Sequence, residues 1–397
     1  MKIAVFSDNF YPELGGVADT VLIMGVELAK RGHQIEYFVP AYNKKDYIIS
    51  GVQEKEIYLH PNIKIHRNWS IPYPTATMQG KLFLPRIWRG FFDHTKFDAV
   101  HSHSFFGPGL DALFFSRIRS IPLIGTNHTL IEAFLLRGLL KAEWLEVIIN
   151  CYIVWYYNHC SLVSTPSSFL LDKMIKRGLK LEALPITNPV EPCFFKARVE
   201  KSFLKNELGL SDFTILYVGR LSEEKNPEVL IRSYVDFVKK YPNTDLIFVG
   251  HGSLRQKLEK FAKESGASKK IKFAGPFTGE NKKKLYDYFH ASDVFVTPSL
   301  FETQSMSTIQ AMASGLPVIA SSVGPLLELV SPDRGFLFNP GDSNILSQKI
   351  EELYLQPELR KRLGLNAKNF AMKFSVEKVA DEWERIYSDV INKYLYR

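Results

Sequence analysis

Short apolar segments alternate with helical patterns along the whole chain, and this alternation limits the possible folds more than any other feature of the sequence. In the first half the expected strands are Ile3–Ser7, Ile35–Val39, Ala99–Ser102, Leu123–Thr126 and Leu162–Thr165. In the second half they are Thr214–Val218, Asp245–Val249, Ile271–Ala274, Val294–Thr297 and Pro317–Ala320. The helices expected between them include Val17–Arg31, Ser168–Arg177, Pro227–Lys240, Leu254–Ser265 and Asn281–His290. Such alternation is typical of parallel sheets covered by helices, so the sequence predicts an α/β protein.

A turn-rich stretch divides the chain into two parts. The eight residues from Pro185 to Pro192 include three prolines, which is typical of a stiff linker. A chain of 397 residues also exceeds the size at which one hydrophobic core usually keeps growing. We therefore expect one domain over residues 1–192, a second over 193–375, and an amphipathic helix over 376–397 that packs back on the first.

Each half predicts a doubly wound, Rossmann-like domain, and we expect the two domains to face each other across a cleft. Ligands bind to such sheets at the carboxyl ends of the strands. The residues that follow the expected strands are therefore the first candidates for a functional site.

The net charge and the cysteine content narrow the classes of partner. The formal net charge of +8 favours anionic partners such as nucleotide phosphates, an acidic membrane surface or nucleic acid. No nucleic-acid recognition motif is present, so nucleic acid has only the net charge in its favour and is not expected as a partner. The three cysteines show no metal-ligand spacing, which fits a reducing compartment.

The apolar segments are too short for membrane insertion. Met1–Asp8 predicts a strand rather than a signal peptide, because its apolar run is short and no cleavage site follows. The most apolar region, Val147–Tyr157, is shorter than the roughly 20 residues that a helix needs to cross a bilayer. We expect a cytoplasmic protein that is soluble or peripheral to a membrane.

The segment from Phe301 to Ala320 follows an expected strand and then enters a helix. It brings a carboxylate, several hydroxyls and unpaired backbone N–H groups together, and a helix N-terminus is a ready site for phosphate. An alternative role for Glu302 is to cap the helix, but Thr303 and Ser305 can serve equally well. We therefore expect the Glu302 side chain to point at a ligand.

Two cations follow the first expected strand of the second half. Arg220 lies at the strand end and Lys225 at the start of the next helix. Two fixed cations at this place suit a diphosphate, since Arg offers a fork of donors and Lys a point charge. The alternative is that both are solvated beside Glu223 and Glu224.

The first half offers a glycine pair and three histidines. Gly15 and Gly16 open a helix after the first strand and allow a ligand to approach the backbone closely, although such a pair is also common in tight turns. They do not form a full G-x-G-x-x-G dinucleotide fingerprint. His128 follows a strand and can contact a sugar hydroxyl or an acceptor. His101 and His103 share one face of a strand, but no third metal ligand is evident, so no metal site is predicted.

In order and spacing, these pieces resemble glycosyltransferase family 4, whose members have the GT-B fold. The pieces that match cover nearly the whole chain: Gly15-Gly16, Thr126–Thr129, Pro166-Ser167, Asn188–Val190, Gly219–Asn226, Gly250–Gly252 and Phe301–Gly315. The resemblance implies retaining transfer of a hexose from a nucleotide diphosphate sugar, UDP-linked in preference to GDP-linked. It also implies no metal and no other cofactor, and the sequence has no Asp-x-Asp motif.

Carried over by position, the resemblance assigns roles to the candidate residues. Arg220 and Lys225 would hold the diphosphate, Glu302 would contact hydroxyls of the donor sugar, and His128 would lie beside the reacting sugar. These four form the expected catalytic set. The expected donor-binding set is Gly15, Gly16, Gly219, Arg220, Lys225, Glu302, Thr303, Gln304, Ser305, Met306, Ser307 and Gln310.

Two positions depart from the family pattern. Gln310 stands where the family has a second glutamate that binds the ribose diol, and Ser305 stands where a glycine is usual. A glutamine keeps a hydrogen-bonding oxygen but loses the charge, which weakens one contact by about 1–2 kcal/mol. These departures bear on the identity of the donor and on the level of activity.

The stretch from Lys64 to Phe92 mixes basic and aromatic residues without an acidic one before Asp93. A basic, aromatic stretch with helical character can lie in an anionic membrane interface, and we expect Lys81, Arg86, Trp88 and Arg89 to face the membrane. The region Ile131–Tyr157 adds further apolar side chains, although both stretches could instead be core helices. The first half also resembles the subgroup that glycosylates diacylglycerol or phosphoinositol lipids. We therefore expect a lipid acceptor at the cytoplasmic face of a membrane.

Three other functions stay open. The same chemistry could act on a soluble sugar or polysaccharide acceptor. A sugar-nucleotide epimerase or a phosphorylase could share a similar fold, but no lysine motif for pyridoxal phosphate stands out. Finally, Ser305 and Gln310 could mark a degraded, non-catalytic site, although Arg220, Lys225 and Glu302 argue against this.

Overall fold

The computed structural model describes the whole chain except residues 14, 56, 73–80, 83–94, 130–142 and 397. The chain divides into two compact units. The first unit is Met1–Pro189 together with Val376–Arg397, and the second is Val190–Ser375. The chain thus passes between the units at the end of the proline-rich stretch, and its C-terminal segment belongs to the first unit.

The first unit is built on a seven-stranded sheet in which every neighbouring pair is parallel. Its strands are β1 (Lys2–Phe6), β2 (Gln34–Pro40), β3 (Ile63–Asn68), β6 (Ala99–Ser102), β7 (Leu123–Thr126), β8 (Leu162–Thr165) and β9 (Ala183–Pro185). The order across the sheet is β3-β2-β1-β6-β7-β8-β9. The direction of winding therefore reverses between β1 and β6, which is the switch point where such sheets bind ligands.

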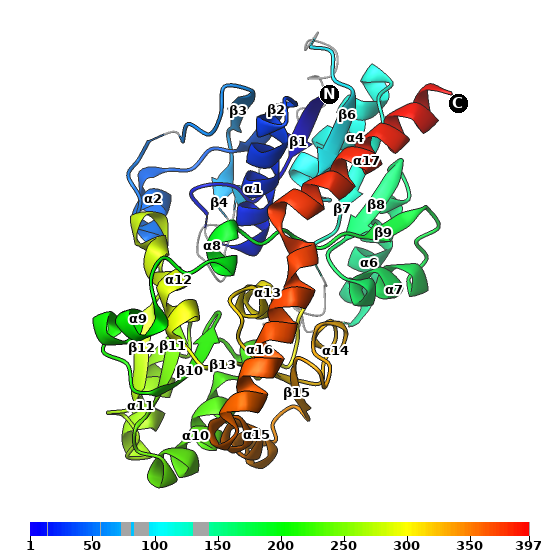
Figure 1. Cartoon of the computed structure of the whole chain (residues 1–397). Helices are drawn as coiled ribbons and strands as arrows, with labels where there is room; N and C mark the ends of the chain where they lie inside the picture. The colour runs from blue at the N-terminus through cyan, green and yellow to red at the C-terminus, as the bar shows by residue number, and fades with distance from the viewer. Residues whose placement is uncertain (14, 56, 73–80, 83–94, 130–142, 397) are drawn as a thin grey trace. The chain divides into compact units, whose positions relative to one another are not determined.

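The described helices of this unit are α1 (Gly16–Lys30), α2 (Lys44–Ser50), α4 (Gly107–Arg119), α6 (Glu143–Tyr157), α7 (Ser168–Lys176) and α17 (Val376–Leu395). On one face of the sheet α1 and α17 pack against the strands, and on the other face α4, α6 and α7 do. Along β1, Ile3 and Val5 pack into the core formed with α1 and α17, while Ala4 and Phe6 pack into the core formed with α4 and α6. This is the two-residue alternation of a strand that is buried on both faces. Figure 1 shows α17, in red, lying beside α1.

A short antiparallel pair, β4 (Ile71–Pro72) and β5 (Lys81–Leu82), stands apart from this sheet. The structure places Lys81 differently from our expectation of a membrane-facing residue. Its side chain is buried and its Nζ lies 2.7 Å from Oδ2 of Asp46, so the charge is paired inside the unit. The prediction was therefore wrong for Lys81. Arg86, Trp88 and Arg89 lie outside the described residues.

The second unit repeats the architecture with a six-stranded parallel sheet. Its strands are β10 (Phe213–Val218), β11 (Thr244–Val249), β12 (Ile271–Gly275), β13 (Val294–Thr297), β14 (Val318–Ser321) and β15 (Gly335–Phe338). The order β12-β11-β10-β13-β14-β15 is that of a Rossmann-like domain, with the switch point between β10 and β13. The prediction of two Rossmann-like α/β domains is confirmed.

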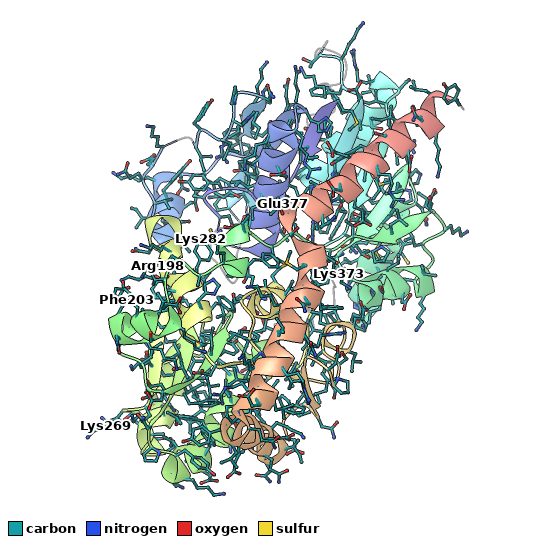
Figure 2. The ribbon with its side chains drawn as sticks, viewed as in Figure 1. Arg198, Phe203, Lys269, Lys282, Lys373 and Glu377 are labelled. Atoms are coloured by element: carbon teal, nitrogen blue, oxygen red, sulfur yellow. The ribbon has the colours of Figure 1, made fainter. Side chains whose placement is uncertain are left out.

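Nine helices of the second unit are described: α8 (Pro192–Phe195), α9 (Lys201–Leu208), α10 (Pro227–Lys240), α11 (Arg255–Glu264), α12 (Lys282–Ala291), α13 (Met306–Ala313), α14 (Leu326–Leu329), α15 (Ser343–Leu355) and α16 (Pro357–Ala371). Ion pairs tie the entering chain to α12. Nε of Arg198 lies 2.8 Å from Asp287, and Nζ of Lys282 lies 2.6 Å from Glu191; Figure 2 labels both basic side chains.

The two ends of the second unit meet. The Val190 N–H donates to the Phe374 carbonyl over 2.8 Å, and Val190 forms a parallel bridge with Ser375. The chain therefore enters and leaves this unit at one place.

Candidate functional site

The loop after β10 holds Arg220 in a fixed backbone frame. The Gly219 N–H donates to the Val249 carbonyl over 3.0 Å, and the Leu221 N–H donates to the His251 carbonyl over 3.0 Å. The loop that follows β11 packs so closely against Leu221 that a Cβ at Gly252 would lie 2.3 Å from the Leu221 carbonyl oxygen, so only glycine fits there. The glycines at Gly219 and Gly252 thus belong to the support of Arg220.

Both cations at this switch point have carboxylate partners. Nη2 of Arg220 lies 3.2 Å from Oε1 of Glu224, and Nζ of Lys225 lies 2.6 Å from Oε1 of Glu302. Glu224 and Glu302 are buried, whereas the Arg220 side chain keeps 37% of its surface exposed. The structure therefore brings Arg220, Lys225 and Glu302 together in one charge-balanced cluster, as neighbours at the carboxyl ends of β10 and β13.

Glu302 does not cap the following helix. Its Oε1 accepts hydrogen bonds from Lys225 and from the Ser299 hydroxyl over 2.8 Å. No hydrogen bond from the described residues reaches its Oε2. One carboxylate oxygen is thus fixed by the protein, and the other keeps its capacity to accept a hydrogen bond from a ligand.

The cap of α13 is Ser305, in the left-handed conformation with φ 70° and ψ 69°. Its hydroxyl lies 2.8 Å from that of Thr308 rather than on a backbone amide. The first N–H groups of a helix have no partner within it, so those of Met306 and Ser307 are oriented towards the end of the helix where Glu302 lies. This is an arrangement that suits phosphate.

The donor-binding residues expected on this segment differ in accessibility. Gln304 and Ser305 are buried, whereas Thr303, Met306, Ser307 and Gln310 stay partly exposed. Residues three and four apart share one helix face, so Met306, Ser307 and Gln310 lie on the same side of α13. A ligand at the N-terminus of α13 would meet this face, while Gln304 and Ser305 shape the loop from within.

The first unit places its candidates at its own switch point. Gly15 is the N-cap of α1, Gly16 is the first helical residue, and a Cβ at Gly15 would meet no atom within 4 Å. Packing inside the unit therefore does not require a glycine at Gly15. The open space beside it fits our expectation that a ligand approaches this turn.

The three histidines form one cluster with α17. Nδ1 of His103 lies 3.0 Å from Nε2 of His128, and the His101 and His103 ring centroids are 4.2 Å apart. Nδ1 of His101 lies 2.6 Å from the Tyr387 hydroxyl, and its Nε2 lies 2.7 Å from the Thr126 hydroxyl. Burial lowers the pKa of His101 to about 3 and that of His128 to about 4, and it holds the pKa of His103 well below its usual value. All three are therefore neutral imidazoles at pH 7.

Sequence reasoning missed two carboxylates in the loop between β1 and α1. Oδ2 of Asp8 accepts a hydrogen bond from the Ser104 hydroxyl over 3.0 Å, and burial raises the pKa of Asp8 to about 6. Glu13 accepts hydrogen bonds from Asn9 and Tyr42, and burial raises the pKa of Glu13 to about 8. The position of Asp8, directly after the first expected strand, was the available signal. Over the described residues, no group of three or more potential metal ligands occurs.

Comparisons with known proteins match both units. A family model described as Glycosyltransferase Family 4 matches residues 14–191, and one described as Glycosyl transferases group 1 matches residues 199–370. The α-monoglucosyldiacylglycerol synthase of Acholeplasma laidlawii is 27% identical, and the alignment covers 99% of this chain and 98% of the relative.

Two solved structures share the fold over nearly the whole chain. Sucrose-phosphate synthase from Thermosynechococcus elongatus has a TM-score of 0.79 at 20% identity, covering 99% of this chain and 100% of that one. HepE of Anabaena, solved in complex with UDP and glucose, has a TM-score of 0.74 at 18% identity, covering 98% of this chain and 99% of that one. The expected GT-B fold is confirmed.

Proposed function

Because the chain belongs to the glycosyltransferases of family 4 and has the GT-B fold, we propose that it transfers a hexose from a nucleotide diphosphate sugar to a lipid hydroxyl with retention of configuration. A UDP-sugar is the favoured donor, with GDP-mannose as the alternative. The HepE complex with UDP and glucose supports the choice of base. The relative that is named a monoglucosyldiacylglycerol synthase supports a lipid such as diacylglycerol or a phosphoinositide as acceptor.

One observation carries the donor half of the proposal: the cluster of Arg220, Lys225 and Glu302 beside the N-terminus of α13. Breaking the bond between sugar and phosphate builds negative charge on the diphosphate. Arg220, Lys225 and the amides of Met306 and Ser307 would stabilise this charge, so no metal ion is required. The free oxygen of Glu302 would accept a hydrogen bond from a sugar hydroxyl.

Retention follows if the acceptor attacks from the face that the diphosphate leaves. The departing phosphate oxygen then accepts the proton of the acceptor hydroxyl, and no enzyme nucleophile takes part. His128 would lie beside the reacting sugar as a neutral hydrogen-bonding group, since its pKa is lowered to about 4 by burial. A neutral imidazole can donate or accept one hydrogen bond without repelling the positive charge that develops on the sugar.

Exposed apolar side chains of the first unit support a lipid surface as the place of reaction. On α6, Trp144, Val147, Ile148 and Trp155 are exposed at helical spacing. Ile48 on α2 and Trp69 after β3 are exposed as well, and Lys44 and Lys45 of α2 lie in solvent. Of the described helices, none is long and apolar enough to span a bilayer. We propose a peripheral association with the cytoplasmic face of an anionic membrane.

Thermal shift and calorimetry with UDP, GDP and their sugars, with and without EDTA, test the donor half. UDP should raise the melting temperature of the unaltered protein, since a ligand that binds only the folded state stabilises it, and EDTA should not change the shift. Arg220→Ala should weaken UDP binding by about 10- to 100-fold, the loss expected for a charged hydrogen bond. Arg232→Ala, which removes an exposed arginine paired with Glu228 on α10, is the control.

The outcomes separate the alternatives. Equal UDP affinity in Arg220→Ala and Arg232→Ala would remove the phosphate assignment. UDP binding without transfer to any acceptor would favour a non-catalytic site, and transfer to soluble sugars alone would replace the lipid acceptor. The anomeric configuration of the product, read by NMR, decides retention.

A further inference from the structure

The switch point of the first unit carries a row of polar side chains. In the parallel register Phe6 of β1 pairs with Ser102 of β6, and Ser102 pairs with Gly125 of β7. The residues just beyond these positions are Asp8, then His103 and Ser104, then His128. The row runs across three neighbouring strand ends, as the hydrogen bonds from Ser104 to Asp8 and between His103 and His128 show.

Unlike Glu36 and Asp46 of the same unit, Asp8 forms no ion pair among the described residues. Glu36 lies 2.8 Å from Nζ of Lys2, and Asp46 lies 2.7 Å from Nζ of Lys81. Asp8 has no such cation: within the described part of the chain, its only side-chain partner is the Ser104 hydroxyl. The residue is partly exposed as a whole, and burial raises the pKa of its carboxyl group to about 6, so Asp8 is still largely ionised at pH 7. An anion held without a counter-charge retains strong capacity to accept a hydrogen bond.

The charge around Asp8 favours a neutral ligand. Glu13 lies five residues further along the same loop, and because burial raises its pKa to about 8 it is mostly neutral at pH 7 and leaves Asp8 as the charged carboxylate of the loop. Over the described residues, neither carboxyl group has an ion pair. A phosphate beside Asp8 would meet a negative charge that no cation among the described residues offsets, and like charges at close range repel. A hydroxyl group would instead donate a hydrogen bond to Asp8.

The histidine pair supplies the complementary groups. One of the two neutral rings donates the hydrogen bond that joins them, so their outer nitrogens always present one donor and one acceptor. The outer nitrogen of His128, Nδ1, is buried and has no hydrogen-bond partner in the described structure. Buried polar atoms are nearly always paired, so an unpaired one in this row points to a group that arrives with a ligand.

We infer that Asp8, His103 and His128 form the acceptor-hydroxyl site of the first unit, and that this site takes a neutral polyhydroxyl or glycerol headgroup rather than a phosphorylated one. The inference rests on the proposed glycosyl transfer and narrows its acceptor class. Asp8 receives the hydrogen bond of an acceptor hydroxyl, Ser104 fixes the carboxylate, and the histidine pair contacts a second polar atom of the acceptor. Of the two lipids named above, the charge of Asp8 favours diacylglycerol over a phosphoinositide.

The experiment measures sugar transfer from the donor identified by thermal shift to 1,2-diacylglycerol and to phosphatidylinositol, each in detergent micelles. Asp8→Asn should raise the KM for diacylglycerol by about tenfold or more, because the amide that replaces one carboxylate oxygen cannot accept a hydrogen bond. Its affinity for UDP should stay within about twofold of the unaltered protein, since Asp8 lies in the first unit whereas Arg220, Lys225 and Glu302 lie in the second. Asp98→Asn is the matched control. Asp98 directly precedes β6, at the amino ends of the strands and so at the opposite end of the sheet from Asp8, and its Oδ2 accepts a hydrogen bond from the Lys2 N–H.

A second variant guards against a folding defect. Ser104→Ala removes the hydroxyl that orients Asp8 but leaves the carboxylate, so a smaller rise in KM with unchanged UDP affinity is expected. An unchanged KM for diacylglycerol in Asp8→Asn overturns the inference. So does transfer to phosphatidylinositol alone, and in both cases the proposed glycosyl transfer stands. Absence of UDP binding in the unaltered protein removes the proposed function and the inference with it.

Discussion

Ser305 carries a backbone conformation that its side chain disfavours. Its φ of 70° lies in the left-handed region, which costs a residue with a Cβ about 1 kcal/mol relative to glycine. The hydrogen bond between the Ser305 and Thr308 hydroxyls offsets part of this cost. The departure from the family's glycine is therefore a local strain that the loop tolerates rather than a change of the fold.

Ser305→Gly should stabilise the protein by about 0.5–1 kcal/mol, because it removes the strain and retains the turn. Ser307→Gly is the matched control on the same helix, where the substitution should destabilise by a similar amount. Urea unfolding of both variants measures the difference. Destabilisation by Ser305→Gly would show that the hydroxyl contact to Thr308 outweighs the strain.

Glu13 predicts a pH effect of known sign. Its pKa rises from the ordinary 4.5 to about 8 on folding, so between these values the folded state binds a proton that the unfolded state releases. Stability should therefore fall as the pH rises from 4.5 to 8, by at most about 1.4 kcal/mol per pH unit. Glu13→Gln mimics the protonated acid and should gain stability over the unaltered protein as the pH increases. A constant difference from pH 5 to pH 9 in urea unfolding would contradict this.

At the residue scale, some features of the candidate site could be predicted from the sequence and others could not. Arg220, Lys225 and Glu302 could be expected near one another, because each follows a strand of a parallel sheet. The ion pair between Lys225 and Glu302 could not, since 77 residues separate them and only the packing of two loops brings the charges together. The same holds for Asp8: no motif predicts that, among the described residues, its carboxylate pairs with the Ser104 hydroxyl and with no cation.

At the scale of elements, the interior strands were predictable and most edges were not. Nine of the ten predicted strands are interior and are mainly apolar on both faces, so their composition identifies them; the tenth, β12, is an edge strand. The strands that sequence reasoning missed in the two main sheets are β3, β9 and β15, and all three lie at sheet edges. Edge strands need less apolar surface: β3 reads Ile-Lys-Ile-His-Arg-Asn, and β9 is three residues that end in proline.

Helix α6 makes a prediction about the membrane. Trp144, with 66% of its surface exposed, and Val147, with 60%, lie on the solvent face of the helix, so replacing both by Ser should not disturb the core. The double variant should bind anionic vesicles several-fold more weakly, since each large apolar side chain contributes about 1.5–3 kcal/mol when fully buried. Co-sedimentation with phosphatidylglycerol vesicles measures the change.

Ile175→Ser is the matched control for this surface, because Ile175 is an exposed apolar residue on α7. A several-fold loss in the double variant with an unchanged melting temperature supports a lipid-facing α6. Equal binding of the double variant, the control and the unaltered protein would exclude α6 from the membrane contact.

At the scale of the whole molecule, the second unit should behave as an independent protein. Its two main core clusters and its cation cluster are drawn from residues 190–375. The fragment 190–375 should unfold cooperatively in urea and should bind UDP within about tenfold of the full chain, since Arg220, Lys225 and α13 all lie within it. A fragment that unfolds without a cooperative transition would contradict this independence.

Because Val190 bonds to Phe374 and forms a bridge with Ser375, the two units differ in how easily each could be exchanged between proteins. The second unit is one continuous stretch of chain whose ends bond to each other, so it can be exchanged between relatives by joining the chain at only two positions. The first unit cannot, because its core needs Trp383 and Tyr387 from the far end of the chain. A chimera in which residues 190–375 are replaced by the corresponding unit of a relative should thus have the donor preference of that relative. It should keep the acceptor preference of the protein that supplies the first unit.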